Sequence, residues 1–222
     1  MAESSLLKSS IAKKVAMALS GLFLVSFLAL HFFINLTSVF SKETFNACSH
    51  FMGYNPLIQF VMQPVLVAGV IFHFVMGIVL ERKNRSARPV AYVKYDGAAN
   101  ASWASRNMII SGLVVLAFLG LHMYDFWAQE IAYKYCLGNP IDETRYYGEL
   151  VHKFENPIRT SLYCIAFVLL SMHLWHGFNS SFQSVGLNNK FTKGFQKCAY
   201  AFAIIVPLGF IFIALFHHFF NN

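Results

Sequence analysis

Five histidines lie inside otherwise apolar stretches of this chain: His31, His73, His122, His173 and His176. Ionisable side chains are uncommon at membrane depth and by default indicate a functional site. A ring nitrogen of histidine can bind a metal, whereas a lone histidine in a helical bundle is more often a hydrogen-bonded packing residue. The interpretation therefore depends on whether the helices that carry these histidines bring them together.

The composition predicts a membrane protein. Of the 222 residues, 57% are hydrophobic and only 12% are charged, against about 25% charged residues in soluble domains. A membrane-spanning helix needs about 20 apolar residues, and five stretches qualify. They are residues 13–36, 57–80, 107–128, 157–179 and 198–220. We therefore predict an all-α fold, in which residues 1–222 form one integral membrane bundle of five transmembrane helices.

Charge predicts the orientation of this bundle. Twelve Lys and Arg residues precede the first span or lie between spans two and three or four and five, with only Glu3, Glu81 and Asp96 as acids there. Because cytoplasmic loops are rich in Lys and Arg, the N-terminus is expected in the cytoplasm and the C-terminus outside. The net charge of +7 is then a topology signal, and no nucleic-acid-binding motif accompanies it.

The histidines match in depth. His31, His73, His122 and His173 each lie 16 or 17 residues beyond the polar residue or proline at the start of their span, which is about 25 Å along a helix. Successive spans run in opposite directions. We therefore expect His31 and His122 to share a level near the outer face (the outer pair), and His73 and His173 to share one near the inner face (the inner pair). Facing imidazoles across a bundle are what bis-histidine ligation of haem requires, so we predict two haem b groups.

Glycines favour the same interpretation. Gly69 and Gly77 lie one turn before and after His73, and Gly177 lies one turn after His173. They would leave room for a flat macrocycle, although glycines in membrane spans also permit close helix packing. His176, one turn beyond His173, is expected near a propionate or the haem edge.

A histidine relay in a transporter is the competing interpretation. Such relays usually combine Asp, Glu and His at membrane depth. Here the deepest carboxylate is Asp125, at the outer end of the third span, so the haem interpretation is preferred.

Three segments resemble a known family. They are SSIAKKVAMALSGLFLVSFLALHFFINL (9–36), VLVAGVIFHFVMGIVLERKNR (65–85) and SMHLWHGFNSSFQSVGLNNK (171–190). They resemble the dihaem cytochrome b membrane-anchor subunit of succinate dehydrogenase/fumarate reductase, and the similarity extends over nearly the whole chain. The resemblance implies that His31, His73, His122 and His173 ligate the haem irons.

The resemblance also implies partners and a location. In this family a flavoprotein carrying FAD and an iron–sulfur subunit dock on the cytoplasmic side of the bacterial inner membrane. Their expected dock is the basic inner loops 81–106 and 186–197. Electrons from succinate would pass through the inner and then the outer haem to a quinone, with menaquinone expected, or would run in reverse. A dimer of the complex is left open, and a haem anchor of a hydrogenase or formate dehydrogenase is the alternative.

Further site residues are predicted from depth alone. Donors expected near the inner haem propionates are Arg106, Trp103, Lys190 and Ser20, with interfacial anchoring as the alternative role of the first three. Quinone reduction needs a proton-exchanging group near a haem edge, and Asp125 beside Tyr124 and Trp127 is the expected site, with Glu43 as the alternative acid. An interfacial carboxylate beside a Tyr/Trp belt is the alternative interpretation of Asp125. His217 and His218 are expected to be interfacial, and Cys48 and Cys136 could form a disulfide.

Overall fold

The computed structural model describes residues 9–86, 107–187 and 191–220, and within these ranges every regular element is a helix. The elements, in chain order, are α2 (Ser10–Phe40), α3 (Lys42–Tyr54), η1 (Ile58–Met62), α4 (Gln63–Ser86), α7 (Met108–His122), η2 (Met123–Trp127), α8 (Ala128–Ile131), η3 (Ala132–Cys136), α9 (Arg145–Glu155), α10 (Pro157–Ser184) and α11 (Thr192–Phe220). The predicted site residues Trp103, Arg106 and Lys190 lie outside the described ranges.

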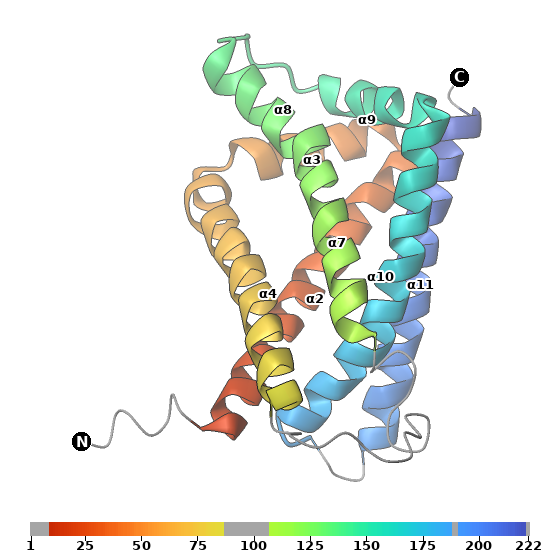
Figure 1. Cartoon of the computed structure of the whole chain (residues 1–222). Helices are drawn as coiled ribbons and strands as arrows, with labels where there is room; N and C mark the ends of the chain where they lie inside the picture. The colour runs from red at the N-terminus through yellow and green to blue at the C-terminus, as the bar shows by residue number, and fades with distance from the viewer. Residues whose placement is uncertain (1–8, 87–106, 188–190, 221–222) are drawn as a thin grey trace.

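Within the described residues five helices are long and apolar enough to cross a membrane, which confirms the predicted fold class. They span Ser10–Phe40, Ile58–Ser86, Met108–Cys136, Pro157–Ser184 and Thr192–Phe220. The third exceeds its predicted end by eight residues, because helix continues from α7 through two π-helical stretches, η2 and η3. The start of α2 and the end of α11 lie at opposite ends of the bundle (Figure 1). We call these the N-terminal end and the α9 end.

Short capped turns place two helices across the α9 end (Figure 1). Ser41 ends α2 and begins α3, where its hydroxyl accepts a hydrogen bond from the backbone N–H of Thr44. Asn156 caps α10 with its side-chain oxygen, and Pro157 occupies the first position of that helix, where its missing N–H costs nothing. Since each connection is a single residue, α3 and α9 stay against the ends of the spans that they adjoin.

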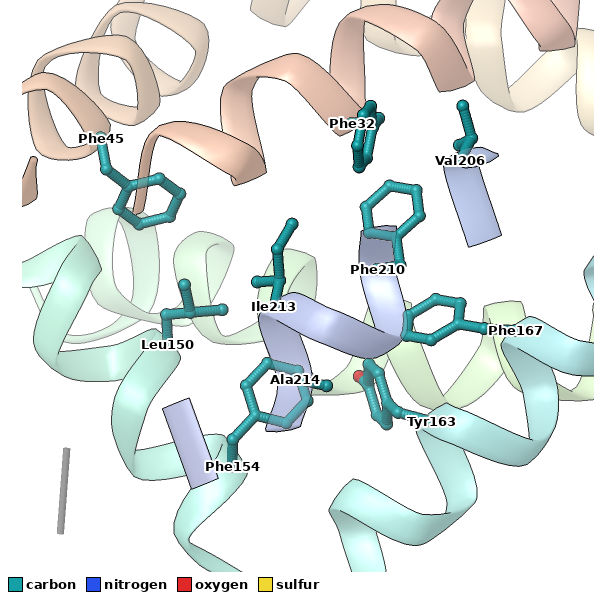
Figure 2. Packing of buried hydrophobic residues seen from close by; sticks show 10 residues of the cluster. All are labelled: Phe32, Phe45, Leu150, Phe154, Tyr163, Phe167, Val206, Phe210, Ile213 and Ala214. Atoms are coloured by element: carbon teal, nitrogen blue, oxygen red, sulfur yellow. The ribbon is translucent and has the colours of Figure 1, made fainter. Parts of the chain in front are cut away.

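The hydrophobic core lies in the half of the bundle near the α9 end and is built around α11 (Figure 2). The rings of Phe167 and Phe210 stack at 5.1 Å, and Phe32 meets Phe210 edge-on at 5.3 Å. Gly209 allows α2 this close to α11, because a Cβ there would overlap the Phe32 ring. Helix α4, in contrast, has no buried residue and packs mainly on α2. Its remaining surface is free for lipid or a non-protein group.

A cluster of charged side chains joins the elements at the α9 end. Glu130 accepts a hydrogen bond from Arg145 and forms an ion pair with Lys134, whose Nζ lies 2.5 Å from the Glu130 carboxylate. Lys134 also donates to the carbonyl of Gly53 at 2.6 Å and lies over the Tyr54 ring. The Arg145 and Lys134 side chains are only 8% and 6% exposed. The cluster therefore connects α3, the extended third span and α9 through buried charges.

Candidate functional site

The outer pair consists of two facing imidazoles from α2 and α7. The ring centroids of His31 and His122 lie 5.6 Å apart, with their planes at 62°. Four residues before each histidine a phenylalanine stacks on its ring, Phe27 at 5.6 Å from His31 and Phe118 at 6.0 Å from His122. Each of the two spans thus carries a stacked Phe–His pair, and the two histidines face each other.

The inner pair joins α4 to α10. The centroids of His73 and His173 lie 6.5 Å apart, with their planes at 71°. The structure therefore brings together the histidines that were paired by depth, one from each of four spans. His173, rather than His176, is the residue of the fourth span that faces His73.

Serine hydroxyls contact both rings of the inner pair. Ser20 Oγ lies 3.0 Å from His73 Nδ1, and Ser111 Oγ lies 3.3 Å from His173 Nδ1. Because Ser20 on α2 marks the level of His73, the 11 residues from Ser20 to His31 measure the spacing between the pairs. At 1.5 Å per residue the two levels are about 16 Å apart, or half of the roughly 30 Å hydrocarbon layer.

The residues present fit a haem at each level. A metal ion bound at about 2 Å by one nitrogen of each ring separates the two imidazole centroids by about 6 Å, and the observed values are 5.6 and 6.5 Å. The described residues contain no cluster of three or more potential metal ligands. Two ligands suffice for haem, because the macrocycle supplies the other four nitrogens. Among these same residues His122 Nδ1 is buried without a hydrogen-bond partner, which leaves a nitrogen of the outer pair unused.

The glycines singled out in the sequence lie against side chains of neighbouring helices. A Cβ added to Gly69 would lie 2.9 Å from the Phe23 ring. One added to Gly77 would lie 3.6 Å from the Met17 side chain, and one added to Gly177 would lie 2.8 Å from the Met108 side chain. The structure thus exhibits the close helix packing that was the alternative interpretation, and space for the macrocycle stays a prediction. The glycines nearest the imidazoles are others: a Cβ on Gly21 would lie 3.3 Å from His73, and one on Gly112 would lie 3.5 Å from His173.

Ser111, Gly21 and Gly112 were not among the residues predicted for the site, although the sequence contains a signal for them. Residues 17–31 (MALSGLFLVSFLALH) and 108–122 (MIISGLVVLAFLGLH) are identical at eight of 15 positions. The repeat contains the Ser–Gly pair that touches an inner histidine and, 11 residues later, an outer histidine. Its first residue is the methionine that packs on Gly77 in one copy and on Gly177 in the other. An internal comparison of the spans pairs Ser111 with Ser20 and Gly112 with Gly21, whereas the contacts themselves come from the structure.

Asp125 is separated from the aromatic residues expected beside it. Its side chain is fully buried, accepts a hydrogen bond of 2.9 Å from the Tyr163 hydroxyl and lies 3.4 Å from Arg159 Nε. Tyr124 and Trp127 are 61% and 44% exposed. These residues belong to the π-helical stretch η2. The structure brings Asp125 to α10 and does not assemble the three side chains into one site.

Trp127 instead borders a groove between the start of α4 and the extended third span. Its indole nitrogen donates to Gln63 Oε1 at 3.3 Å, and Gln59 and Tyr135 hydrogen-bond nearby. The groove has a volume of about 510 Å³. The rest of its lining is apolar and consists of Phe60, Pro64, Val67, Ala68, Ile71 and Ile131.

Glu43, the alternative acid, lies at the surface in the first turn of α3. Hydrogen bonds from its own backbone N–H and from the Ser41 hydroxyl lower the pKa of the Glu43 carboxyl. A lowered pKa makes the Glu43 carboxyl a weaker proton acceptor, and its role as the alternative acid stays a prediction.

The prediction that His217 is interfacial is wrong. His217 is fully buried, with its Nε2 2.8 Å from Ser38 Oγ and its ring 5.5 Å from that of Tyr147. The reason is that α9 packs against the end of α11, so the face of this turn that carries His217 lies between α2 and α9, while Phe219 and Phe220 stay exposed. Cys48 and Cys136 are free thiols and form no disulfide.

Comparisons of the chain with protein-family models, with curated proteins and with solved structures find no match. The family resemblance stated above therefore remains a hypothesis, and the geometry of the two histidine pairs is what supports a function.

Proposed function

We propose that this chain is the dihaem cytochrome b membrane anchor of a succinate:quinone oxidoreductase. The observation that carries the proposal is the arrangement of two facing imidazole pairs, drawn from four different spans and placed at two levels. In this proposal His31 and His122 hold the outer haem, and His73 and His173 hold the inner haem. The N-terminal end faces the cytoplasm of a bacterial cell.

The protein contributes ligands, spacing and a low-dielectric surrounding, while haem supplies reversible one-electron transfer when it is bound. Phe27 and Phe118 stack on the outer ligands and fix the ring planes. Helix α4 buries no residue against the rest of the chain, which leaves apolar surface beside His73 for a macrocycle. The two levels, about 16 Å apart, carry electrons in series across half of the membrane.

The proposed partners are a flavoprotein with FAD and an iron–sulfur protein at the N-terminal end. Arg82, Lys83 and Arg85 form a basic surface where α4 ends, and Lys193 and Lys197 lie near the start of α11. An acidic or polar partner surface would complement them.

For the quinone we propose the groove bordered by Trp127 and Gln63. It combines an apolar lining with a few amide, indole and phenol groups, which is how small-molecule sites recognise polar atoms on an apolar ring. It lies beside the same extended third span that carries His122, and menaquinone is the expected substrate.

Purification of the chain with its natural partners tests the proposal. We expect two non-covalent b haems per chain in a reduced-minus-oxidised spectrum and a pyridine haemochrome assay, together with flavin and iron–sulfur clusters in copurifying subunits. A preparation without any haem would overturn the proposal. Haem accompanied by nickel or molybdenum subunits would instead identify the hydrogenase or formate dehydrogenase anchor.

A further inference from the structure

The hydrogen of each inner-pair serine is already committed to its own helix. Ser20 Oγ donates to the carbonyl of Met17 at 2.8 Å, and Ser111 Oγ donates to that of Met108 at 2.9 Å. A serine hydroxyl has one hydrogen and two acceptor lone pairs. A serine that donates to its own helix accepts from the imidazole, and in this arrangement His73 and His173 donate from Nδ1.

This hydrogen-bond direction fixes the tautomer. A neutral imidazole that carries its proton on Nδ1 presents the lone pair of Nε2. Both rings of the inner pair are thus held with Nε2 as the free ligand nitrogen. The glycine that follows each serine lies against the Cε1 edge of the same ring, with its hypothetical Cβ at 3.3 Å for Gly21 and 3.5 Å for Gly112.

Among the residues that the structure describes, this arrangement occurs twice, both times at the inner level. Ser20 and Ser111 occupy the same position of the repeat 17–31/108–122. In the outer pair, by contrast, His122 Nδ1 has no partner among the described residues, and the His31 ring has only the amide of Asn35, at 3.4 and 3.5 Å. The same serine–imidazole contact is made to two different helices, α4 and α10, and a shared role at the inner site explains it best.

We propose that Ser20 and Ser111 are positioning residues that hold the two inner haem ligands in the Nδ1–H tautomer and tune the reduction potential of the inner haem. This replaces the expected role of Ser20 as a propionate donor and rests on the proposed haem function. A hydrogen bond from the distal N–H of a ligating histidine increases the basicity of the ligand nitrogen and fixes the ring plane. A more basic ligand favours the oxidised iron.

The test is a redox titration of the purified complex, followed by visible and low-temperature EPR spectra, for Ser20→Ala, Ser111→Ala and the double variant. We expect an upward shift of the inner haem potential in each single variant, a larger shift in the double variant, and an altered EPR signal of the inner haem alone. Thr at either position retains the hydroxyl, so Ser20→Thr and Ser111→Thr should restore both readouts. Ser26→Ala is the matched control, because Ser26 is an exposed α2 serine whose hydroxyl, within the described part of the chain, bonds to the carbonyl of Leu22 and to no imidazole.

Each outcome bears on the proposal. Loss of the inner haem in the Ala variants, with recovery in the Thr variants, would support it equally. Unchanged potentials and spectra, equal shifts of both haems, or a failure of Thr to restore what Ala removes would overturn it. A wild-type complex without haem would overturn the proposed function instead, so the two failures are distinguishable.

Discussion

The hydroxyl of Ser171, on α10, donates a hydrogen bond of 2.6 Å to the backbone carbonyl of Ala203, on α11. This carbonyl lies four residues before Pro207, which sits inside α11 and has no N–H to offer it. In the hydrocarbon layer of a membrane no water is present to hydrogen-bond an unpaired carbonyl. The side chain of one span thus supplies the donor that the backbone of its neighbour lacks.

Ser171→Ala should therefore destabilise the bundle by about 1 kcal/mol, the usual range of interhelical hydrogen bonds in membranes. Pro207→Ala would return a helical N–H to the Ala203 carbonyl. In that background we expect the Ser171→Ala change to cost clearly less. Unfolding of the four variants in detergent completes a double-mutant cycle, and equal costs in both backgrounds would contradict the prediction.

Gly209→Ala should weaken the contact between α2 and α11. The added methyl group would overlap the Phe32 ring within a packed core, and such overpacking costs about 2 kcal/mol. Gly194→Ala provides the control, because a Cβ at Gly194, on the same helix, meets nothing within 4 Å. Because Ala is a better helix former than Gly, Gly194→Ala should leave the thermal unfolding midpoint unchanged or raise it, whereas Gly209→Ala should lower it. An equal fall of the midpoint in both variants would contradict the Phe32 contact as the cause.

His173→Ala should remove the inner haem, whereas His176→Ala should retain it. The reason is that His173 is the histidine that faces His73, at 6.5 Å between ring centroids. Haem content and the reduced-minus-oxidised spectrum measure both variants. Should His176→Ala be the variant that loses the inner haem, the ligand assignment within this helix is reversed.

Glu130→Gln should destabilise the α9 end by about 3 kcal/mol, because it leaves the nearly buried cations of Arg145 and Lys134 without their shared carboxylate. Glu149 also pairs with Arg145 but is 43% exposed, so Glu149→Gln should cost under 1 kcal/mol. The comparison uses thermal unfolding at neutral pH. Similar costs for the two variants would mean that the buried cations find other partners.

Gln63→Leu should raise the KM for menaquinone without changing haem content, because Gln63 is one of the few polar groups in the proposed quinone groove. Asp125→Asn tests the other candidate quinone site, which was predicted from the sequence and has Asp125 as its proton donor. With Asp125 buried against Tyr163, we expect an unchanged KM. A fall in kcat for Asp125→Asn would support the proton-donating role predicted for this carboxyl, and an unchanged KM for Gln63→Leu would exclude the groove.

The sequence by itself determined the number of spans and the level of each histidine. Both follow from quantities that act along one helix: about 20 apolar residues cross the hydrocarbon, and each residue advances 1.5 Å. For this reason the pairing of His31 with His122 and of His73 with His173 could be predicted before any packing was known. The repeat that identifies Ser111 is equally local and could have been found in the same way.

The tertiary structure alone decided which direction each side chain faces. Rotation about a helix axis depends on contacts with segments far away in the chain, so depth could not reveal that Ser20 bonds to His73 or that Asp125 turns towards Tyr163 while Trp127 borders a groove. The π-helical stretch η2 adds a rotation that an ideal helical period does not contain. Likewise, the burial of His217 depends on residues far away in the chain, Ser38 on α2 and Tyr147 on α9.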